Sequence, residues 1–223
     1  MSTQVLIAPD YEVWGNVNQL NLPPYWSRAK NQGSDNPGSV YIDTPRPSNV
    51  SRDYFRHTVA IDAIFHAGYL DTDAAHFGVV SGGAASYYSP RDLSGLAVIA
   101  GNYGQGVRSV GAEGIQLHPQ VPAGNVHPYT AAGVIQHDQW YRFVVDAICM
   151  NGAVAIEIRA RNVQTSELVA DSGTHWLMSP WLFDRDKQRV VLFSIPMGNQ
   201  AALIRVKNAV CYWTAADAWV PNP

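Results

Sequence analysis

Residues 139–162 read QWYRFVVDAICMNGAVAIEIRARN, and this stretch has the clearest strand pattern in the chain. Two runs of alternating apolar and polar residues flank the dipeptide Asn151-Gly152. A period of two is typical of a β-strand with one buried face. Asn-Gly best suits the two-residue type I′ turn, because both central positions need a positive φ. We therefore predict a β-hairpin that turns at Asn151-Gly152.

The turn also fixes the register, because a slip by one residue would move every side chain to the other face of the sheet. Counting back from the turn gives Asp146–Glu157, Val144–Arg159 and Arg142–Arg161 on one face, and Cys149–Val154, Ala147–Ile156, Val145–Ile158 and Phe143–Ala160 on the other. One face is apolar and the other is charged. This arrangement predicts a sheet that packs its apolar face against a second sheet.

Other stretches predict further strands. Residues 56–65 alternate with period two, and 189–195 form a continuous apolar run typical of a central strand. Residues 203–213 alternate again, with Val210 and Tyr212 expected on one side and Cys211 on the other. Shorter strand candidates are residues 12–17, 39–43, 79–81, 96–100 and 115–118.

Prolines punctuate residues 1–55, which we expect to be irregular, and glycines and prolines make 101–133 a long loop region. No stretch has the apolar stripe of a helix, and nothing resembles a linker between domains. We predict a single all-β domain over residues 1–223. Its predicted architecture is a two-sheet antiparallel jelly-roll sandwich with long loops, and residues 1–55 pack on it or extend from it.

Composition narrows the function classes. Charged residues make up 15% of the 223 residues, against about 25% in ordinary soluble proteins, and the net charge is −3. The chain has no basic run, which argues against nucleic acid as a partner. No apolar stretch reaches the roughly 18 residues of a membrane span. The N-terminus lacks the basic and apolar regions of a secretory signal, so we expect synthesis in a cytoplasm.

Two cysteines, Cys149 and Cys211, fall on predicted strands. A disulfide between them is geometrically possible. We favour free, buried thiols, because a chain without a secretion signal stays in a reducing compartment.

The C-terminal half resembles the concanavalin A-like lectin/glucanase superfamily. The residues that carry the resemblance are 140–146 (WYRFVVD), the hairpin strand 155–159 (AIEIR) and the closing strand 204–213 (IRVKNAVCYW). The resemblance implies a β-sandwich and favours carbohydrate binding. It carries no catalytic residue across, because the Glu-x-Asp-x-Glu pattern of the glucanase branch is absent here.

The charged face of the hairpin is the first candidate site. Asp146 and Glu157, if directly opposite, would have Cβ atoms roughly 5 Å apart, close enough for the two carboxylates of a glycosidase. The alternative is a solvated or interface surface where Arg159 neutralises Asp146 from a diagonal position, with Arg142 and Arg161 nearby. We favour this alternative and assign no catalytic residue.

Loop residues offer weaker candidates. Asp71 and Asp73 present carboxylates that suit Ca²⁺, but two carboxylates are too few for a site, so we predict no cofactor and no metal. His118 and His127 precede prolines and are expected to be exposed loop histidines. Exposed aromatic residues stack on sugar rings and also dominate protein interfaces. The aromatic candidates for such contacts are Tyr103, Tyr129, Trp176 and Trp181.

Three functions fit these observations. The one we favour is a non-catalytic, lectin-like structural or adhesive assembly protein, such as a phage virion decoration, fibre or tail component. It fits the absent export signal, the scarcity of charge and the long aromatic loops. Its expected partners are other subunits in a homo-oligomer, with polysaccharide as a further option and no membrane. The alternatives are a free carbohydrate-binding protein and a glycoside hydrolase or polysaccharide lyase.

Overall fold

The structure is a computed structural model of the chain. It describes residues 3–13, 27–30, 37–65, 76–81, 98–100, 107–109, 136, 138–171, 174–176, 185–194 and 204–218. Every regular element within these ranges is a β-strand, so the all-β prediction is confirmed. In the same ranges, no helix has the length and apolarity to cross a membrane.

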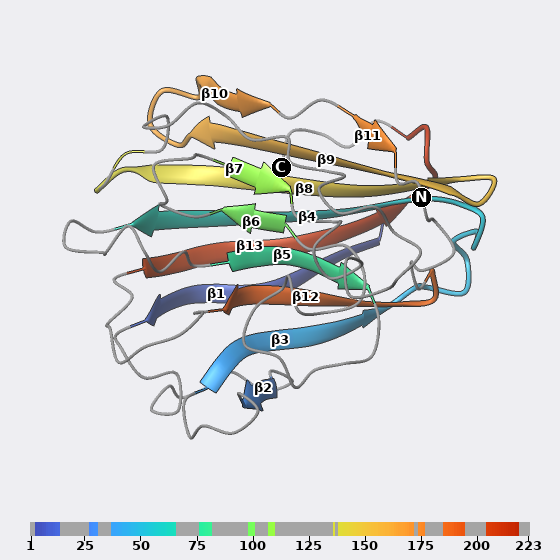
Figure 1. The fold of residues 1–223 in the computed structure, drawn as a ribbon, viewed down its shortest axis with the longest axis horizontal. Helices are drawn as coiled ribbons and strands as arrows, with labels where there is room; N and C mark the ends of the chain where they lie inside the picture. Colours follow the sequence, from blue (N-terminus) through green and yellow to red (C-terminus); the bar gives the residue numbers. More distant parts are fainter. Residues whose placement is uncertain are drawn as a thin grey trace, which may run out of the picture.

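The larger sheet has seven strands in the order β1-β13-β4-β8-β9-β10, and β11 also pairs with β9 (Figure 1). All its pairings are antiparallel. Its strands are β1 (Thr3–Val13), β4 (Tyr54–Phe65), β8 (Trp140–Met150), β9 (Ala153–Asn162), β10 (Leu168–Asp171), β11 (His175–Trp176) and β13 (Ile204–Thr214).

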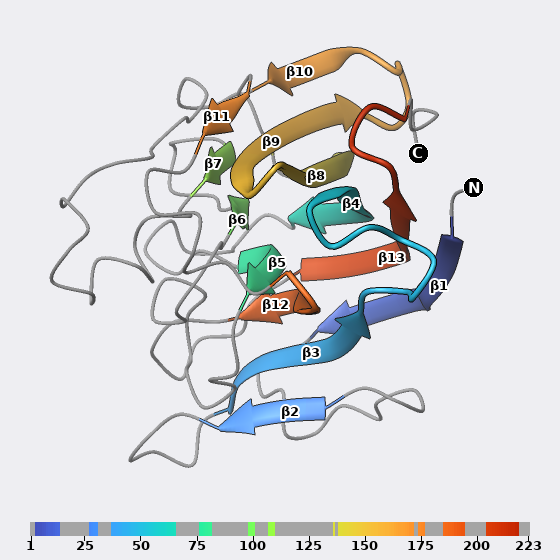
Figure 2. The ribbon, with the colours of Figure 1, turned by 90° about the vertical axis from the view of Figure 1, so that its right-hand side faces the viewer.

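Two smaller sheets form the second layer. A four-stranded sheet has the order β2-β3-β12-β5, and a two-stranded sheet pairs β6 with β7. These strands are β2 (Ser27–Lys30), β3 (Pro37–Pro45), β5 (His76–Ser81), β6 (Val98–Ala100), β7 (Val107–Ser109) and β12 (Lys187–Ser194). They lie in front of the seven-stranded sheet in Figure 1, and the side view of Figure 2 separates the layers. The predicted sandwich is confirmed, with β12 as an interior strand.

The hairpin of β8 and β9 forms as predicted. Asn151 and Gly152 have φ angles of 50° and 85°, the positive values that a type I′ turn needs. The ladder pairs Asp146 with Glu157 and Cys149 with Val154, and the other predicted pairs are also present. The backbone N–H of Asn151 donates to the carbonyl of Asp53 at 2.7 Å, which ties the turn to the start of β4.

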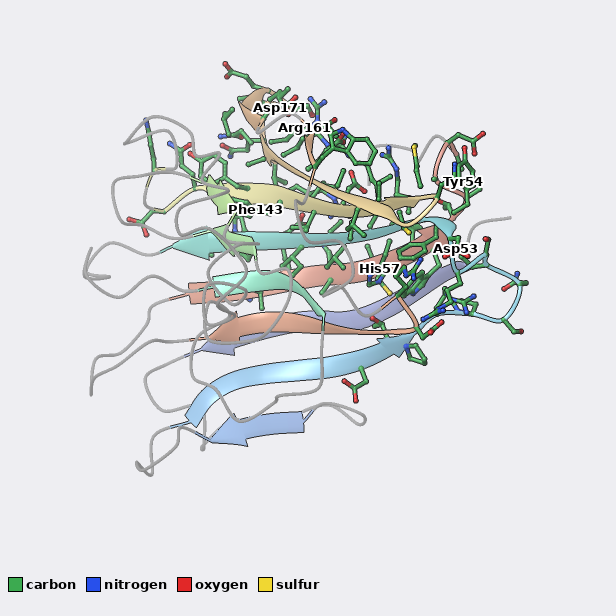
Figure 3. All side chains as sticks on the ribbon, turned by 45° about the vertical axis from the view of Figure 1, so that its right-hand side comes forward. Asp53, Tyr54, His57, Phe143, Arg161 and Asp171 are labelled. Carbon is green, nitrogen blue, oxygen red and sulfur yellow. The ribbon has the colours of Figure 1, made fainter. Side chains whose placement is uncertain are left out.

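The apolar face of the seven-stranded sheet carries the core. Phe55, Ala147, Cys149, Val154 and Trp213 are buried there in one cluster with Val50. His57 is also fully buried, and its ring stacks on Trp213 with centroids 4.0 Å apart (Figure 3). These side chains come from β4, β8, β9 and β13, so the core joins strands from both halves of the chain.

Both cysteines are free and buried, as predicted. They lie on the apolar face, where Cys149 pairs with Phe55 and Cys211 pairs with Val59. Burial raises the pKa of Cys211 to about 12 and also raises the pKa of Cys149. Apolar surroundings disfavour the thiolate, so both thiols are held in the unreactive protonated form.

The prediction that residues 1–55 are irregular is wrong. This segment supplies β1 to the larger sheet and β2 and β3 to the smaller one, so the expected strands 12–17 and 39–43 were misplaced or too short. Pro9 lies inside β1, which ends the strand order and shares its ladder with β13 alone among the described strands. An edge strand tolerates proline because one side of it makes no ladder hydrogen bonds.

The predicted faces of the last strand are also wrong beyond Asn208. The register of β13 against β4 shifts between Lys207 and Val210, and Asn208 has a φ of 52°. One extra residue in a bulge moves each following side chain to the other face. Cys211 therefore lies on the core face, and Val210 and Tyr212 pack on the opposite face beside Ala60 and Val144.

The predicted loop region 101–133 contains β7, so part of it is strand. The candidate strand 115–118 lies outside the described residues. The other short predictions agree better, since 79–81 falls within β5 and 96–100 overlaps β6.

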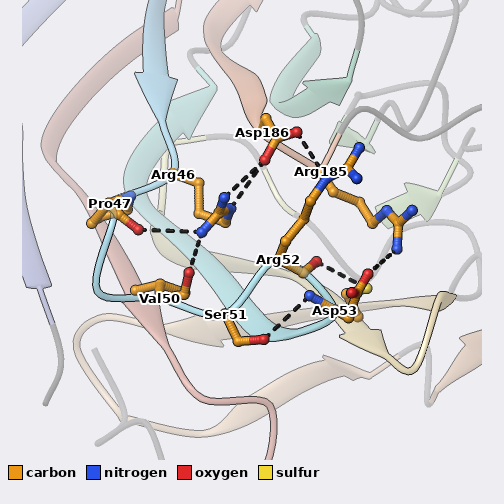
Figure 4. Close-up of polar contacts among 9 residues, drawn as sticks. Arg46, Pro47, Val50, Ser51, Arg52, Asp53, Arg185 and Asp186 are labelled. Atoms are coloured by element: carbon orange, nitrogen blue, oxygen red, sulfur yellow. Dashed lines mark hydrogen bonds and ion pairs between the residues drawn. The ribbon is translucent and has the colours of Figure 1, made fainter.

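Ion pairs hold the loop between β3 and β4, where the chain passes from the smaller sheet to the larger one (Figure 4). Asp186, just before β12, lies 2.9 Å from the guanidinium of Arg46 and 2.8 Å from that of Arg52. Arg185 pairs with Asp53 in the same place. The hydrogen bond from Arg46 lowers the pKa of Asp186. Exposed pairs of this kind contribute little each, but together they fix the path of this loop.

Candidate functional site

The predicted acidic pair lies on the face of the seven-stranded sheet opposite the core cluster. Asp146 and Glu157 are directly opposed across the β8–β9 ladder, as the turn predicted. The side chain of Asp146 has no exposed surface. Asp146 itself is therefore not solvated, and the predicted diagonal contact with Arg159 is present at 2.7 Å. The alternative expectation, that this surface is an interface, stays a prediction.

Neighbouring strands complete the surroundings of Asp146. The guanidinium of Arg56 on β4 lies 3.6 Å from the carboxylate, and the hydroxyl of Thr58 donates to its other oxygen. Thr58 faces Asp146 directly in the β4–β8 ladder. One negative charge is thus held by two positive charges and a hydroxyl, which offsets the cost of burying it.

A second buried acid, Asp62, is also paired with an arginine. It lies on β4, four residues after Thr58. Asp62 is almost fully buried and lies 2.8 Å from the guanidinium of Arg142, its partner in the ladder. The side-chain amide of Asn208 donates to the other carboxylate oxygen at 2.7 Å. We call the seven residues Arg56, Thr58, Asp62, Arg142, Asp146, Arg159 and Asn208 the charged network.

Charged side chains at the outer rim of this face also make defined contacts with neighbouring residues. Lys207 places its ammonium 4.0 Å from the ring centroid of Trp140, within the range of a cation–π contact. Arg161 donates to the carbonyl of Ser166 at 3.2 Å. These side chains hold one another in place along the strands, so this part of the sheet face is a packed ionic surface.

The geometry of the charged network limits its chemistry. A general acid or base must come within hydrogen-bond reach of the group that it protonates or deprotonates. Asp146 has no exposed surface, and its oxygens are occupied by two arginines and a threonine. Its carboxylate is therefore out of reach of a bound substrate, which fits a structural role.

Glu157 differs from its partner because it faces the edge of the sheet. Its carboxylate accepts a hydrogen bond from the hydroxyl of Thr174, which is exposed. Two residues further, Trp176 on β11 pairs with Ala155 on β9. The side chain of Trp176 is 51% exposed, the most of any large hydrophobic residue in the described part of the chain.

The segment after β13 covers the hairpin end of the same face. Ala216 is fully buried against Ile148 and Ala155, with Tyr54 and Met150 packed beside them. Desolvation and the nearby Asp217 carboxylate, which is hydrogen-bonded to the phenol, raise the pKa of Tyr54. Among the described residues of this face, the most exposed aromatic side chain is therefore at the β11 edge and not at the hairpin end.

The remaining candidates from the sequence lie outside the described residues. They are Asp71, Asp73, Tyr103, His118, His127, Tyr129 and Trp181. Among the residues that the structure describes, no group of three or more His, Cys, Asp or Glu side chains is placed to hold a metal ion.

Sequence reasoning missed Arg56, Thr58, Asp62 and Asn208 as members of the charged network. The alternation of residues 56–65 placed the first three on one face, but it did not say that β4 lies between β8 and β13. The polar residues recurring at Arg56, Thr58 and Asp62 on an otherwise apolar strand were the signal that could have found them.

No family model and no curated protein matches the chain. Among solved structures, arcelin-5, a lectin-like defense protein from Phaseolus vulgaris, aligns over 95% of this chain and 97% of its own, with 7% identity and a TM-score of 0.51. The chain has a concanavalin A-like jelly-roll fold. The fold that the C-terminal half predicted is thus confirmed.

Two further structures align over most of the chain. Peanut lectin, solved with a 9-mer peptide, covers 96% of this chain and 97% of its own, with 7% identity and a TM-score of 0.49. The CBM2 module of an evolved Dit protein from Lactobacillus casei BL23 phage J-1 covers 95% and 99%, with 10% identity and a TM-score of 0.47.

Proposed function

We propose that this protein is a non-catalytic, lectin-like binding protein with a structural or adhesive role in an assembly, such as a decoration, fibre or tail component of a phage virion. The observation that carries the proposal is the burial of Asp146, one of the two acids of the predicted pair. Asp146 is buried and ion-paired to Arg56 and Arg159, while the exposed aromatic residue on the same face, Trp176, lies at the sheet edge.

The buried acid argues against the hydrolase and lyase alternative. Glycoside hydrolysis needs two carboxyl groups that both reach the scissile bond. Here Glu157 is only half-buried and reaches the edge, but its partner Asp146 lies beneath arginine side chains. A substrate that contacts Glu157 has no access to the second carboxylate of this pair.

Trp176 supports binding in place of catalysis. A half-exposed indole leaves apolar surface in water, and large aromatic side chains contribute strongly when a ligand covers them. The lectin-like fold shared with arcelin-5 makes a glycan a reasonable ligand class. The charge-poor composition and the aromatic residues of the sequence favour contacts with other subunits as well.

Three measurements on the purified chain test the proposal. Mass photometry tests for an oligomer, a glycan array tests for sugar binding, and a reducing-end and unsaturated-product assay on a polysaccharide panel tests for turnover. We expect an oligomer or glycan binding, and no turnover. A strict monomer without sugar affinity would contradict the proposal, and so would turnover that is lost in Asp146→Asn.

A monomer that binds glycans would favour the alternative of a free carbohydrate-binding protein. Both an assembly protein and a free carbohydrate-binding protein could use Trp176 for binding. The oligomeric state therefore distinguishes these two functions.

A further inference from the structure

The edge of the seven-stranded sheet at β11 combines one flat aromatic surface with one hydrogen-bonded carboxylate. Trp176 faces Ala155 across the ladder, so the position beside the indole on β9 carries only a methyl group. Ala155 itself is fully buried. The indole therefore has open surface on a strand that is hydrogen-bonded to β9, which costs less conformational entropy on binding than a loop residue would.

The polar partner lies on the same face. Successive side chains of a strand alternate, so Thr174 and Trp176 project to one side, about 7 Å apart at roughly 3.3 Å per residue. The hydroxyl of Thr174 donates to the carboxylate of Glu157, which fixes the direction of that group. An ionised carboxylate accepts about four hydrogen bonds, so Glu157 has capacity for further donors.

The surroundings favour a small ligand over a broad protein interface. Among the described residues, the other exposed large apolar residues are Val163, in the turn after β9, and Leu168. Leu168 pairs with Arg161, six residues from Ala155 along β9. That separation is about 20 Å along the strand. Trp176 and Leu168 thus form no continuous apolar patch. A stable protein interface buries about 800 Å² per partner, far more than one indole provides.

The charges favour an uncharged ligand. Glu157 and Asp171 lie on the same face of this edge, since Asp171 pairs with Arg159 two residues along β9 from Glu157. Arg159 points its guanidinium to the buried Asp146. Among the described residues of this edge, Glu157 and Asp171 carry carboxylates, while Arg159 contacts the buried Asp146 and Arg161 donates to the carbonyl of Ser166.

We infer that Trp176, Glu157 and Thr174 form a subsite for a neutral pyranose at the edge of the seven-stranded sheet. The inference rests on the proposed function and names its ligand class. The indole stacks on the apolar C–H face of the sugar ring. Glu157 accepts hydrogen bonds from hydroxyl groups at the ring edge, and Thr174 is a positioning residue that orients Glu157.

The test starts with an array of neutral oligosaccharides, namely glucans, mannans, galactans and xylans, with heparin and polygalacturonate as anionic comparators. The best ligand is then titrated against the intact chain by indole fluorescence. We expect neutral glycans to bind, and Trp176→Ala to weaken binding at least about fivefold. Trp176→Phe keeps an aromatic surface and should lose less.

Three further variants sharpen the test. Glu157→Gln removes the charged acceptor and should weaken binding about tenfold, since hydrogen bonds to charged groups are the stronger ones. Thr174→Val should weaken binding less, and Thr174→Ser should restore it, which a purely structural role would not require. Leu168→Ala is the matched control, because it removes another exposed apolar side chain elsewhere on the edge, and it should bind as the wild type does.

The outcomes separate this inference from the proposed function. Glycan binding that survives Trp176→Ala and Glu157→Gln overturns the subsite and leaves a lectin-like protein that binds elsewhere. Binding of anionic glycans alone overturns the neutral ligand class. An oligomer without any glycan binding overturns the subsite and leaves the assembly role in place.

Discussion

Asp146 and Arg159 lie diagonally across the β8–β9 ladder, and a guanidinium nitrogen of Arg159 lies 2.7 Å from a carboxylate oxygen that is fully buried. This contact keeps Asp146, one half of the acidic pair at the hairpin, away from solvent and from any ligand. Together with Arg56 and Thr58 it makes Asp146 part of the scaffold. The same face still presents Trp176 and Glu157 at its edge, where a ligand can reach them.

Replacing Asp146 tests the scaffold role directly. Asp146→Asn keeps the shape but removes the charge that compensates Arg56 and Arg159. We expect the free energy of unfolding to fall by about 2–4 kcal/mol, because partly buried arginines lose their partner. Urea denaturation measures the loss. Glu167→Gln, at an exposed carboxylate in the turn after β9, is the control and should change stability by less than about 0.5 kcal/mol. Equal stability of the two variants would contradict a scaffold role.

The hairpin turn offers a second prediction. Gly152 has a φ of 85°, and a Cβ added there would meet only a guanidinium nitrogen of Arg185 at 3.9 Å. Space is available, so the cost of Gly152→Ala is conformational and should be about 1–2 kcal/mol. Gly152→Asn should cost less, because asparagine tolerates this backbone region better. Thermal unfolding ranks the variants, and alanine as stable as glycine would show that the turn is not of type I′.

Asn208 combines a φ of 52° with a hydrogen bond to Asp62. Asn208→Ala loses the bond and keeps the unfavourable backbone, so we expect a loss of about 1–2 kcal/mol. Asn208→Gly loses the bond alone and should be the more stable of the two. The opposite order, measured by denaturation, would show that the bulge does not impose this conformation.

The buried thiols predict a pH dependence. The pKa of Cys211 is raised from 9.0 to about 12 by burial. Above pH 9 the unfolded chain loses this proton while the folded chain keeps it. The stabilisation is therefore complete below pH 9 and is lost as the pH rises to 12. The free energy of unfolding should fall by up to about 1.4 kcal/mol per pH unit from this group.

A thiol reagent and a variant check this prediction. Cys211→Ala should flatten the alkaline slope, whatever it does to stability at neutral pH. A disulfide reagent at pH 8 should label neither cysteine of the folded chain and both after denaturation. Rapid labelling of the folded chain would show that Cys149 and Cys211 are not enclosed.

The hairpin could be predicted from sequence residue by residue, because Asn151-Gly152 fixes both the turn geometry and the register. The charged network could not, because Arg56 and Asp62 meet β8 only through pairing with a strand about 85 residues away in the chain. Local alternation carries no information on which strands become neighbours. The face of Cys211 could not be predicted for a similar reason, since alternation alone does not reveal the bulge at Asn208, whose side chain contacts Asp62 on β4.

The N-terminal strands could not be predicted from sequence, because proline disfavours most positions of a strand. Pro9 is compatible with β1 only because β1 ends the strand order, which is a property of the whole sheet. Trp176 was named among the candidates by residue type. Its exposure follows from its place on a two-residue edge strand, which no periodicity reveals.

Affinity electrophoresis through gels that contain neutral polysaccharides is the most direct test of a binding protein that does not act on its ligand. It reports retention of the protein and the length of the polymer in one experiment. We expect slowed migration of the wild type, faster migration of Trp176→Ala and polymer of unchanged length. Shortened polymer in the wild-type lane, and intact polymer with a stably folded Asp146→Asn, would contradict this expectation.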